Sequence, residues 1–374
     1  MTALLGALFS LYLLYLLWEA YSVRIARKKL AHVVHVNGTR GKSTVSRLIE
    51  AGLRAGGLRV FCKTTGTDPM TIDVNGREEL LCRRGKANIK EQIAVLRRAA
   101  TQNAQVLVVE CMAITPEFQQ TSQHDILRAD IGVITNVRRD HMDVMGDTLP
   151  RIADALCHTV PRRGILFTAE TVMTEWLKAA VEKNGSCFIC TRVRGDEGTI
   201  DFPENVALAL AVCEELGVPR ETAFAGMQHF SRDPYALSLY RLGKAAFIGG
   251  LSINDIQSVC MVWEKLCAEH SWQNKRLMLL INNRGDRASR TEDMLRVCTA
   301  LRPAEVWLLG ASRGYMKRGL KRKLPDVAVR ELAGGTDIAV DSLTEDQVIF
   351  AIGNIAGDGR ELMEHVRREG RAFV

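Results

Sequence analysis

The sequence has no internal repeat and no low-complexity tract. Its 50 Lys and Arg residues are dispersed and only 6% of residues are aromatic, whereas a nucleic-acid-binding face needs clustered basic residues with aromatic platforms. We therefore expect no nucleic-acid partner, and the formal net charge of +7 suits anionic ligands such as nucleotides and polycarboxylates. With 374 residues, 47% of them hydrophobic and 25% charged, the chain is expected to form two globular domains.

The ten cysteines lack the spacing of a zinc finger or a disulfide framework. Only Cys187 and Cys190 form a C-x-x-C pair, and neither a second pair nor a pair of histidines follows at metal-binding spacing. We interpret the cysteines as buried free thiols. This implies a reducing compartment, and hence a cytoplasmic location for the folded part.

Charge is also missing from residues 3–18, which read ALLGALFSLYLLYLLW. This run is just shorter than the ~17–25 apolar residues that normally span a bilayer. Tyr15, Trp18 and Tyr21 lie where an aromatic belt is expected. Four basic residues follow directly, namely Arg24, Arg27, Lys28 and Lys29. Positive charge on this side predicts that the rest of the chain is cytoplasmic.

We predict that residues 1–29 form an uncleaved membrane-anchor helix and a basic linker. The protein would then lie at the cell membrane with its catalytic domains in the cytoplasm. A cleaved signal peptide fits less well, because the basic residues follow the apolar run and no small-x-small cleavage site is clear. The alternative is a helix that packs on another membrane protein or lies in the interface.

From residue 30 onward, short apolar runs alternate with amphipathic stretches of helical period. This alternation predicts an α/β fold, a mainly parallel sheet of the P-loop ATPase type with helices on both faces. The expected strands of this part are 33–36, 106–109, 131–135, 165–168 and 187–191. The expected helices are 43–55, 89–100 and 172–182.

A second set of elements begins near residue 245. Its expected strands are 277–281, 306–309 and 348–351, and its expected helices are 256–266, 291–301 and 361–369. Residues 228–241, which contain Asp233-Pro234 and lack clean periodicity, are expected to link the two parts. We therefore predict an ATP-binding domain over 30–235 and a smaller α/β domain over 236–374.

The segment V-N-G-T-R-G-K-S-T at 36–44 stands between an expected strand and an expected helix. Its glycines allow backbone N–H groups to surround phosphate oxygens, and the start of the helix adds a favourable dipole. Lys42 can reach the β- and γ-phosphates, and the Ser43 hydroxyl can bind Mg²⁺. The segment departs from the full Walker pattern, because Val36 occupies the first glycine position. We predict a nucleotide site here.

Two further polar groups follow expected strands. Glu110 comes directly after 106–109, and D-H-M-D at 140–143 follows 131–135. The carboxyl ends of parallel strands border the ligand crevice, where Glu110 could hold Mg²⁺ directly or through water. A carboxylate that caps a neighbouring helix is an equal alternative for Glu110. The two carboxylates around His141 suit metal coordination, with one acid orienting the imidazole.

Four motifs together resemble the ligase subunit of poly-γ-glutamate synthases (the PgsB/CapB type), a branch of the Mur ligase and folylpolyglutamate synthase superfamily. They are N-G-T-R-G-K-S-T at 37–44, K-T-T-G-T-D at 63–68, E-C-M-A at 110–113 and N-V-R-R-D-H-M-D-V-M-G at 136–146. Three later segments stand in the expected order, namely Asn254-Asp255, N-R-G-D-R at 283–287 and Gly353-Asn354-Ile355. The resemblance covers nearly the whole chain, including the apolar N-terminus.

The resemblance implies an ATP-dependent acid–amino-acid ligase that uses Mg²⁺. Its ATP-binding residues would be Asn37, Gly38, Thr39, Arg40, Gly41, Lys42, Ser43, Thr44, Asn136, Asn283, Arg284, Asp286 and Arg287. Its substrate-binding residues, which line the acyl-phosphate region, would be Lys63, Thr64, Thr65 and Thr67. Ser43 and Glu110 would hold a first metal ion and His141 a second. Lys42, Glu110 and His141 would form the catalytic set.

Many Mur ligases carry a carbamylated lysine about fifteen residues beyond the motif histidine, where it bridges a second metal ion. In this sequence that place holds Leu156. The nature of a second metal site is therefore left open by the sequence.

The implied reaction extends poly-γ-glutamate through an acyl phosphate that forms from ATP and is then attacked by the amine of glutamate. The implied partners are glutamate, the growing polyglutamate chain, the membrane and integral-membrane synthase subunits, with a homo-oligomer left open. Two alternative functions remain open at this point. One is an ATPase subunit that energises a polymer exporter, and the other is a folylpolyglutamate or Mur-type ligase with another substrate.

Overall fold

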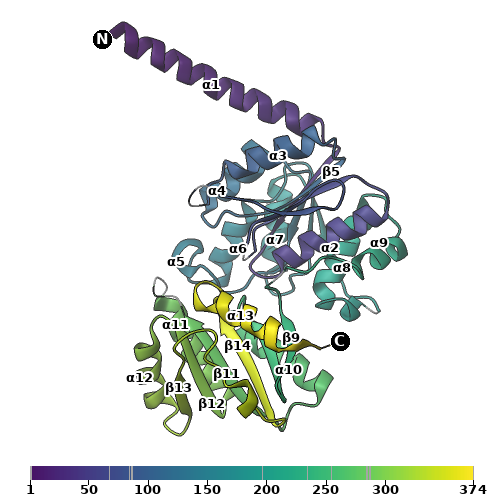
Figure 1. Ribbon diagram of the computed structural model, residues 1–374. Coiled ribbons are helices and arrows are strands. Elements are labelled where there is room, and N and C mark those ends of the chain that lie inside the picture. Colours follow the sequence, from purple (N-terminus) through teal and green to yellow (C-terminus); the bar gives the residue numbers. More distant parts are fainter. Residues whose placement is uncertain are drawn as a thin grey trace. The chain divides into compact units, whose positions relative to one another are not determined.

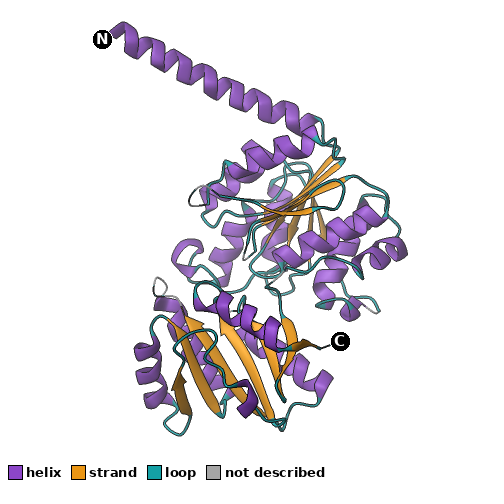
Figure 2. Cartoon of the chain, in the orientation of Figure 1, coloured by secondary structure: helices purple, strands orange, loops and turns teal. Residues whose placement is uncertain are grey.

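A computed structural model describes residues 2–66, 68–83, 85, 87–195, 197–233, 235–253, 255–283, 285 and 288–373 (Figure 1). These residues form two compact units, which span 1–233 and 234–374. Each unit consists of a sheet with helices packed on it (Figure 2).

The first unit contains an eight-stranded sheet in the order β4-β3-β2-β5-β1-β6-β7-β8. Six of the strands run parallel, and β3 and β4 add an antiparallel edge. The strands are β1 (His32–Asn37), β2 (Val60–Thr64), β3 (Met70–Ile72), β4 (Glu78–Leu80), β5 (Val106–Glu110), β6 (Ile131–Ile134), β7 (Ile165–Thr168) and β8 (Cys187–Cys190).

Helices cover both faces of this sheet. One apolar core lies under α2, α8 and α9, and two others lie on the opposite face, under α3 and under α6 and α7. The helices are α1 (Thr2–Lys28), α2 (Lys42–Ala55), α3 (Glu91–Thr101), α4 (Pro116–Gln120), the π-helix Thr121–Leu127, α5 (Met142–Met145), α6 (Leu149–Cys157), α7 (Thr174–Lys183), the 3₁₀ turn Glu197–Thr199, α8 (Pro203–Glu215) and α9 (Arg220–Met227).

The central strand β1 is apolar at successive positions because both of its faces are covered by helices. Val34 and Val36 pack on one face beneath α2, whereas Val33 packs on the other face beneath α3. A parallel strand covered on both sides has to bury every side chain, which gives a continuous apolar run instead of an alternation. The polar exception, His35, is bonded to Gln123 at 2.8 Å, and burial lowers its pKa to about 4.

Helix α1 runs without a break from the apolar N-terminal segment onto the first unit. Its first part is exposed, and α1 is the one helix among the described residues that is long and apolar enough to cross a membrane. Its last part packs against α3, where Val23 and Ala26 are buried. Glu19 of α1 forms an ion pair with Lys90, just before α3, at 3.1 Å.

Two cations also contact aromatic rings of α1. The Lys90 ammonium lies 5.7 Å from the centre of the Tyr15 ring, and the Arg97 guanidinium lies 4.9 Å from that of Trp18. Near the end of α1, Arg27 forms an ion pair with Asp130 at 2.8 Å. These contacts make the end of α1 part of the first unit, so most of the basic stretch that was expected to be a linker is helix.

The second unit contains a seven-stranded sheet in the order β13-β12-β11-β14-β10-β9-β15. β9 and β15 form an antiparallel edge, and the other strands run parallel. The strands are β9 (Ser238–Leu242), β10 (Ala245–Gly250), β11 (Arg276–Asn283), β12 (Glu305–Gly310), β13 (Ala328–Glu331), β14 (Gln347–Gly353) and β15 (Arg371–Ala372). The helices are α10 (Ile256–His270), α11 (Ala288–Leu301), α12 (Arg313–Lys323), α13 (Asp358–Glu369) and the 3₁₀ turn Val340–Ser342.

The predicted fold class is confirmed: both sheets are mainly parallel, helices cover them, and an apolar helix precedes them. Every expected strand and helix is present close to its expected bounds. One interpretation was wrong, because residues 238–241 belong to β9 and not to a link. β9 pairs antiparallel with β10 and most of its side chains are only half-buried, so it carries no clean apolar pattern.

Two N-terminal deletions separate the exposed part of α1 from its docked part. Deleting residues 2–14 removes only exposed side chains and should leave the stability of the first unit unchanged. Deleting residues 2–28 also removes Val23, Ala26 and the Arg27–Asp130 ion pair, which should lower the free energy of unfolding by about 3 kcal/mol. Urea titration of both variants measures the difference. Equal stability of the two would contradict the docking of α1.

Candidate active site

Three adjacent parallel strands bring the predicted polar segments to one edge of the first sheet. β1 lies between β5 and β6, and the register places Val36 beside both Glu110 and Val133. The carboxyl ends of adjacent parallel strands meet at the same edge. The loop after β1, Glu110 at the end of β5 and the segment after β6 are therefore neighbours.

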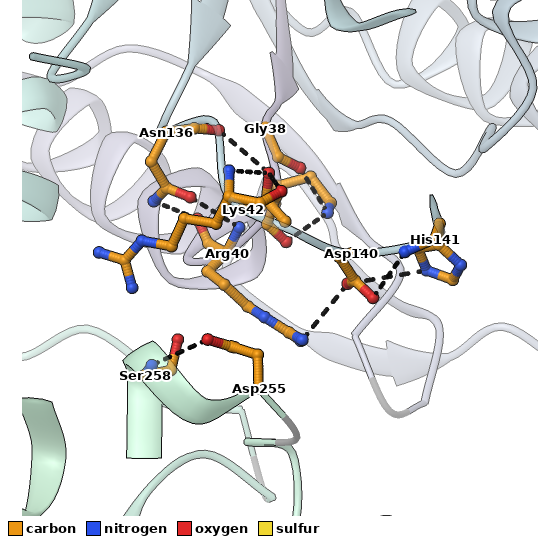
Figure 3. Close-up of polar contacts among 10 residues, drawn as sticks. Gly38, Arg40, Lys42, Asn136, Asp140, His141, Asp255 and Ser258 are labelled. Atoms are coloured by element: carbon orange, nitrogen blue, oxygen red, sulfur yellow. Dashed lines mark hydrogen bonds and ion pairs between the residues drawn. The ribbon is translucent and has the colours of Figure 1, made fainter. Parts of the chain in front are cut away.

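The loop between β1 and α2 depends on two glycines. Gly38 and Gly41 have φ values of 122° and 81°, in a region that other residues rarely adopt. A Cβ atom on Gly38 would lie 2.1 Å from Thr135 Oγ1, so no larger residue fits there. The Lys42 ammonium lies over the loop and donates to the Gly38 carbonyl oxygen at 2.8 Å (Figure 3). A glycine turn at a helix N-terminus with a lysine beside it fits a bound polyphosphate.

The segment after β6 holds this phosphate loop in place. Asn136 accepts a hydrogen bond from the Arg40 N–H at 3.1 Å and donates one to the Arg40 carbonyl oxygen at 3.1 Å (Figure 3). The Thr39 N–H donates to the Asn136 carbonyl oxygen at 3.0 Å, and the Arg138 N–H donates to Thr39 Oγ1 at 2.9 Å. Asn136 therefore fixes the phosphate loop here, and its contact with a nucleotide base or ribose stays a prediction.

Glu110 joins the phosphate loop to the K-T-T-G-T-D segment. Its Oε2 atom accepts a hydrogen bond from Ser43 Oγ at 2.8 Å and another from the Thr65 N–H at 2.6 Å. The carboxylate is buried at the end of β5. A hydroxyl and a carboxylate in direct contact are oxygen donors of the type that Mg²⁺ and Mn²⁺ prefer. These residues fit a divalent cation, and their role as its ligands stays a prediction.

His141 is connected to the phosphate loop in a different way. Its backbone N–H donates to Asp140 Oδ1 at 3.0 Å, and its ring Nε2 atom lies 3.8 Å from Asp140 Oδ2. Asp140 also forms an ion pair with Arg40 at 3.3 Å (Figure 3). Within the described parts of the chain, no group of three or more His, Cys, Asp or Glu side chains could hold a metal ion. Leu156 is fully buried in the core beneath α6 and α7, so position 156 offers no ligand.

The predicted substrate residues lie partly inside the first unit. Lys63 and Thr64 are buried, and Thr67 lies outside the described residues. Lys63 forms an ion pair with Glu91 at 2.8 Å, and Glu91 also accepts two hydrogen bonds from Arg83. Burial raises the pKa of Glu91, but the hydrogen bond from Arg83 and the charge of Lys63 lower it below its usual value. The Lys63 ammonium is thus directed to Glu91 in this structure, and its contact with substrate stays a prediction.

Fewer predicted residues can be placed in the second unit. Asn283 is buried at the end of β11, and its carbonyl oxygen accepts the Ala311 N–H at 2.9 Å. Asp255 caps α10 by accepting the Ser258 N–H at 2.8 Å (Figure 3). The other predicted residues of this unit lie outside the described residues, namely Asn254, Arg284, Asp286 and Arg287.

Sequence reasoning missed Glu170, which anchors the segment after β6. Its buried carboxylate accepts the Val137 N–H at 2.6 Å. It also accepts the N–H groups of Val172 and Met173, at 2.6 Å and 3.1 Å. Glu170 follows the expected strand 165–168 closely, and a carboxylate after a strand is the same signal that singled out Glu110.

The position of Val137 gives this contact its importance. Val137 lies between Asn136 and Arg138, which hold Thr39 and Arg40 of the phosphate loop. A continuous chain of hydrogen bonds therefore runs from the Glu170 carboxylate to the phosphate loop. Glu170 positions the loop without being part of it.

Comparison with known proteins gives two family matches. Residues 236–369 match the model described as the poly-gamma-glutamate synthase CapB C-terminal domain, and residues 36–192 match the Mur ligase middle domain. The chain is 32% identical to the capsule biosynthesis protein CapB of Bacillus anthracis, over 99% of this chain and 83% of that protein. It is 34% identical to the PGA synthase CapB of Bacillus subtilis (strain 168), over 89% of each.

Solved structures share the fold at lower identity. A bifunctional folylpolyglutamate synthase/dihydrofolate synthase from Yersinia pestis, complexed with AMPPNP and Mn, superimposes with a TM-score of 0.70 at 16% identity, covering 93% of this chain and 91% of its own. Another structure of a bifunctional enzyme of this name, with Mn, AMPPNP and L-glutamate bound, gives a TM-score of 0.66 at 16% identity, covering 92% and 93%. At these identities the likeness shows the fold alone.

The Glu170 anchor can be tested against a matched buried carboxylate. Glu170→Gln replaces a charge-assisted acceptor with a neutral one, so the phosphate loop should loosen and the KM for ATP should rise by about three- to tenfold. Glu197→Gln is the control, because Glu197 is equally buried but pairs with Arg220 and the Arg194 N–H. Steady-state kinetics should show a normal KM for the control even if its stability falls. Similar KM shifts in both variants would assign Glu170 a purely structural role.

The metal assignment predicts different effects at Glu110 and His141. Glu110→Gln removes a full negative charge beside Ser43, so turnover should fall by roughly 10²-fold and recover in part at high Mg²⁺ concentration. His141→Ala removes a neutral donor and should have the smaller effect. Turnover measured against Mg²⁺ concentration distinguishes the two variants. Equal losses at every concentration would show that both residues position the chain and do not bind an ion.

Proposed function

This chain belongs to the CapB family of poly-γ-glutamate synthases, and we propose that it is an ATP-dependent amide ligase that extends poly-γ-glutamate. The match of residues 236–369 to the poly-γ-glutamate synthase model carries the proposal, because a phosphate loop alone is shared by the whole superfamily. Membership of this family bears out the expectation of an ATP-dependent carbon–nitrogen ligase.

Each part of the site has a task in this reaction. Lys42 and the N–H groups of its loop bind the triphosphate and offset the negative charge that develops on the γ-phosphate. Ser43 and Glu110 hold a divalent cation beside it, for which we propose Mg²⁺. The ADP, AMPPNP and Mn found in folylpolyglutamate synthases of this fold support a nucleotide and a divalent ion here.

The chemistry proceeds in two displacements. An acceptor carboxylate attacks the γ-phosphate, which gives an acyl phosphate and releases ADP. The amine of glutamate then attacks the acyl carbon, so that an amide forms and phosphate and a proton leave. The bound L-glutamate of one solved neighbour supports an amino acid of this kind as the substrate.

We also propose that α1 attaches the enzyme to a membrane. Its apolar part from Thr2 to Trp18 is about 25 Å long at 1.5 Å per residue, slightly less than the ~30 Å hydrocarbon core. Tyr15 and Trp18 contact the cations Lys90 and Arg97, so the aromatic level of α1 coincides with a charged edge of the first unit. An interfacial aromatic belt has this composition. The chain lacking residues 2–14 should accordingly move from the membrane to the soluble fraction.

The proposed reaction predicts that ATP turnover requires glutamate. The full chain in membranes should release phosphate only when glutamate and an acceptor are present, and should form a γ-linked polymer that NMR identifies. Lys42→Ala should abolish both activities with an unchanged circular dichroism spectrum, because within the described residues its side chain is bound only to the carbonyl oxygens of Gly38 and Thr39.

The alternatives give different results in the same assay. Phosphate release that does not depend on glutamate, with no polymer formed, would indicate an ATPase subunit of an exporter. Stimulation by a folate or a cell-wall precursor and not by glutamate would indicate a ligase with another substrate.

A further inference from the structure

Helix α12 concentrates positive charge on one exposed face of the second unit. It carries six basic residues and no acidic one within 11 residues. Met316 and Leu320 are fully buried, and Gly319 lies against Leu295 of α11, so these positions attach the helix to the unit. The basic side chains occupy the outer side. The basic residues are therefore less evenly dispersed than predicted.

Half of these cations have partners within the unit. Lys317 pairs with Glu331 at 2.8 Å and Lys323 with Glu292 at 2.6 Å. Arg313 donates to the carbonyl oxygen of the residue after β13, Leu332.

The other three cations, Arg318, Lys321 and Arg322, are exposed. The structure shows no ion pair for them among the residues that it describes. We refer to these three side chains as the α12 basic face.

This arrangement is more basic than the fold requires. Lys317 and Lys321, and likewise Arg318 and Arg322, are four residues apart, where like charges repel each other on a helix. Cations in the last turn are favoured by the helix dipole, but this explains only Lys321, Arg322 and Lys323. Internal stability therefore gives no reason for the whole set, whereas an anionic ligand does.

We infer that the α12 basic face binds the γ-glutamate polymer itself. The inference rests on the proposed function, because each γ-amide bond leaves one free α-carboxylate and the product is a polycarboxylate. Residues three and four apart on a helix have Cβ atoms about 5–6 Å apart, so several of these cations can contact one extended polyanion. Such binding keeps the growing chain near the enzyme between additions.

A lipid surface fits this face less well. Membrane-surface helices insert apolar side chains into the bilayer, but Met316 and Leu320 are buried inside the unit. A nucleic acid would use aromatic stacking platforms, and Tyr315 is the only aromatic residue in the sequence of α12. The polymer needs only the charges.

The test uses the full chain in phosphatidylcholine nanodiscs and fluorescently labelled poly-γ-glutamate. The triple variant R318Q/K321Q/R322Q should bind the polymer about tenfold more weakly than the wild type, and the difference should shrink at high salt. The control is the triple variant K178Q/K183Q/K244Q, which removes the same charge at three other exposed lysines and should bind as the wild type does. ATP turnover with a short acceptor should be unchanged in both variants, while the α12 variant should make shorter polymers.

Three results would overturn the inference. The first is that the α12 variant binds the polymer as tightly as the wild type does. The second is that the control variant loses as much polymer affinity as the α12 variant. The third is that the α12 variant loses affinity for phosphatidylglycerol nanodiscs and not for the polymer. Because the polymer is added, binding does not depend on turnover. A wild type without glutamate-dependent turnover would count against the proposed function alone.

Discussion

The hydrogen bonds between the phosphate loop and the segment after β6 are the constraint on which the rest of the site depends. A loop with two glycines in positive φ has many conformations open to it when it is unrestrained. Asn136 bonds the Thr39–Arg40 backbone and Arg138 bonds the Thr39 hydroxyl, which together select one conformation. Glu170 accepts the N–H of Val137, which lies between these two residues. The backbone of the phosphate loop is thus ordered before any phosphate arrives, so binding has little ordering entropy to overcome.

The same edge of the sheet explains why the carboxylate and the loop meet. Glu110 is the last residue of β5, and the parallel register pairs it with Val36 of β1, directly before the phosphate loop. Backbone pairing alone therefore places this carboxylate beside the loop. Ser43, at the start of α2, then contacts it directly. A second metal ligand from position 156 has no such support, because α6 uses Leu156 to pack the core. Any second ion would need ligands other than the lysine of many Mur ligases.

The sequence predicted most of the strands that are buried on both faces, but it did not predict the buried strands β2 and β10. Strands such as β5 and β6 are continuous apolar runs, so their pattern is unambiguous. β3, β4 and β9 were not predicted because they are short or half-buried strands in the antiparallel parts of the two sheets, and their side chains alternate weakly. Helix α12 was missed as well, since its charged residues far outnumber its buried ones.

The site was predictable where its chemistry is local. Lys42 and Ser43 stand in one short motif, and Glu110 is marked by its place after a strand. The Lys63–Glu91 ion pair and the Glu170–Val137 hydrogen bond join residues that are far apart in the sequence, so no spacing rule contains them. Such long-range contacts determine which predicted polar side chains are free to bind a ligand and which are already bonded to other residues of the fold.

The unbroken course of α1 has a mechanical consequence. Because α1 has no hinge and is docked on the first unit, the helix and the unit move together. If the apolar part of α1 is inserted in a bilayer, the first unit diffuses laterally with one face toward the lipid and does not rotate independently of the helix. Its catalytic edge is then held at a constant height above the leaflet. An anionic leaflet repels a polycarboxylate only within a Debye length of its surface, so a product chain that leaves the catalytic edge would be kept from lying on the membrane.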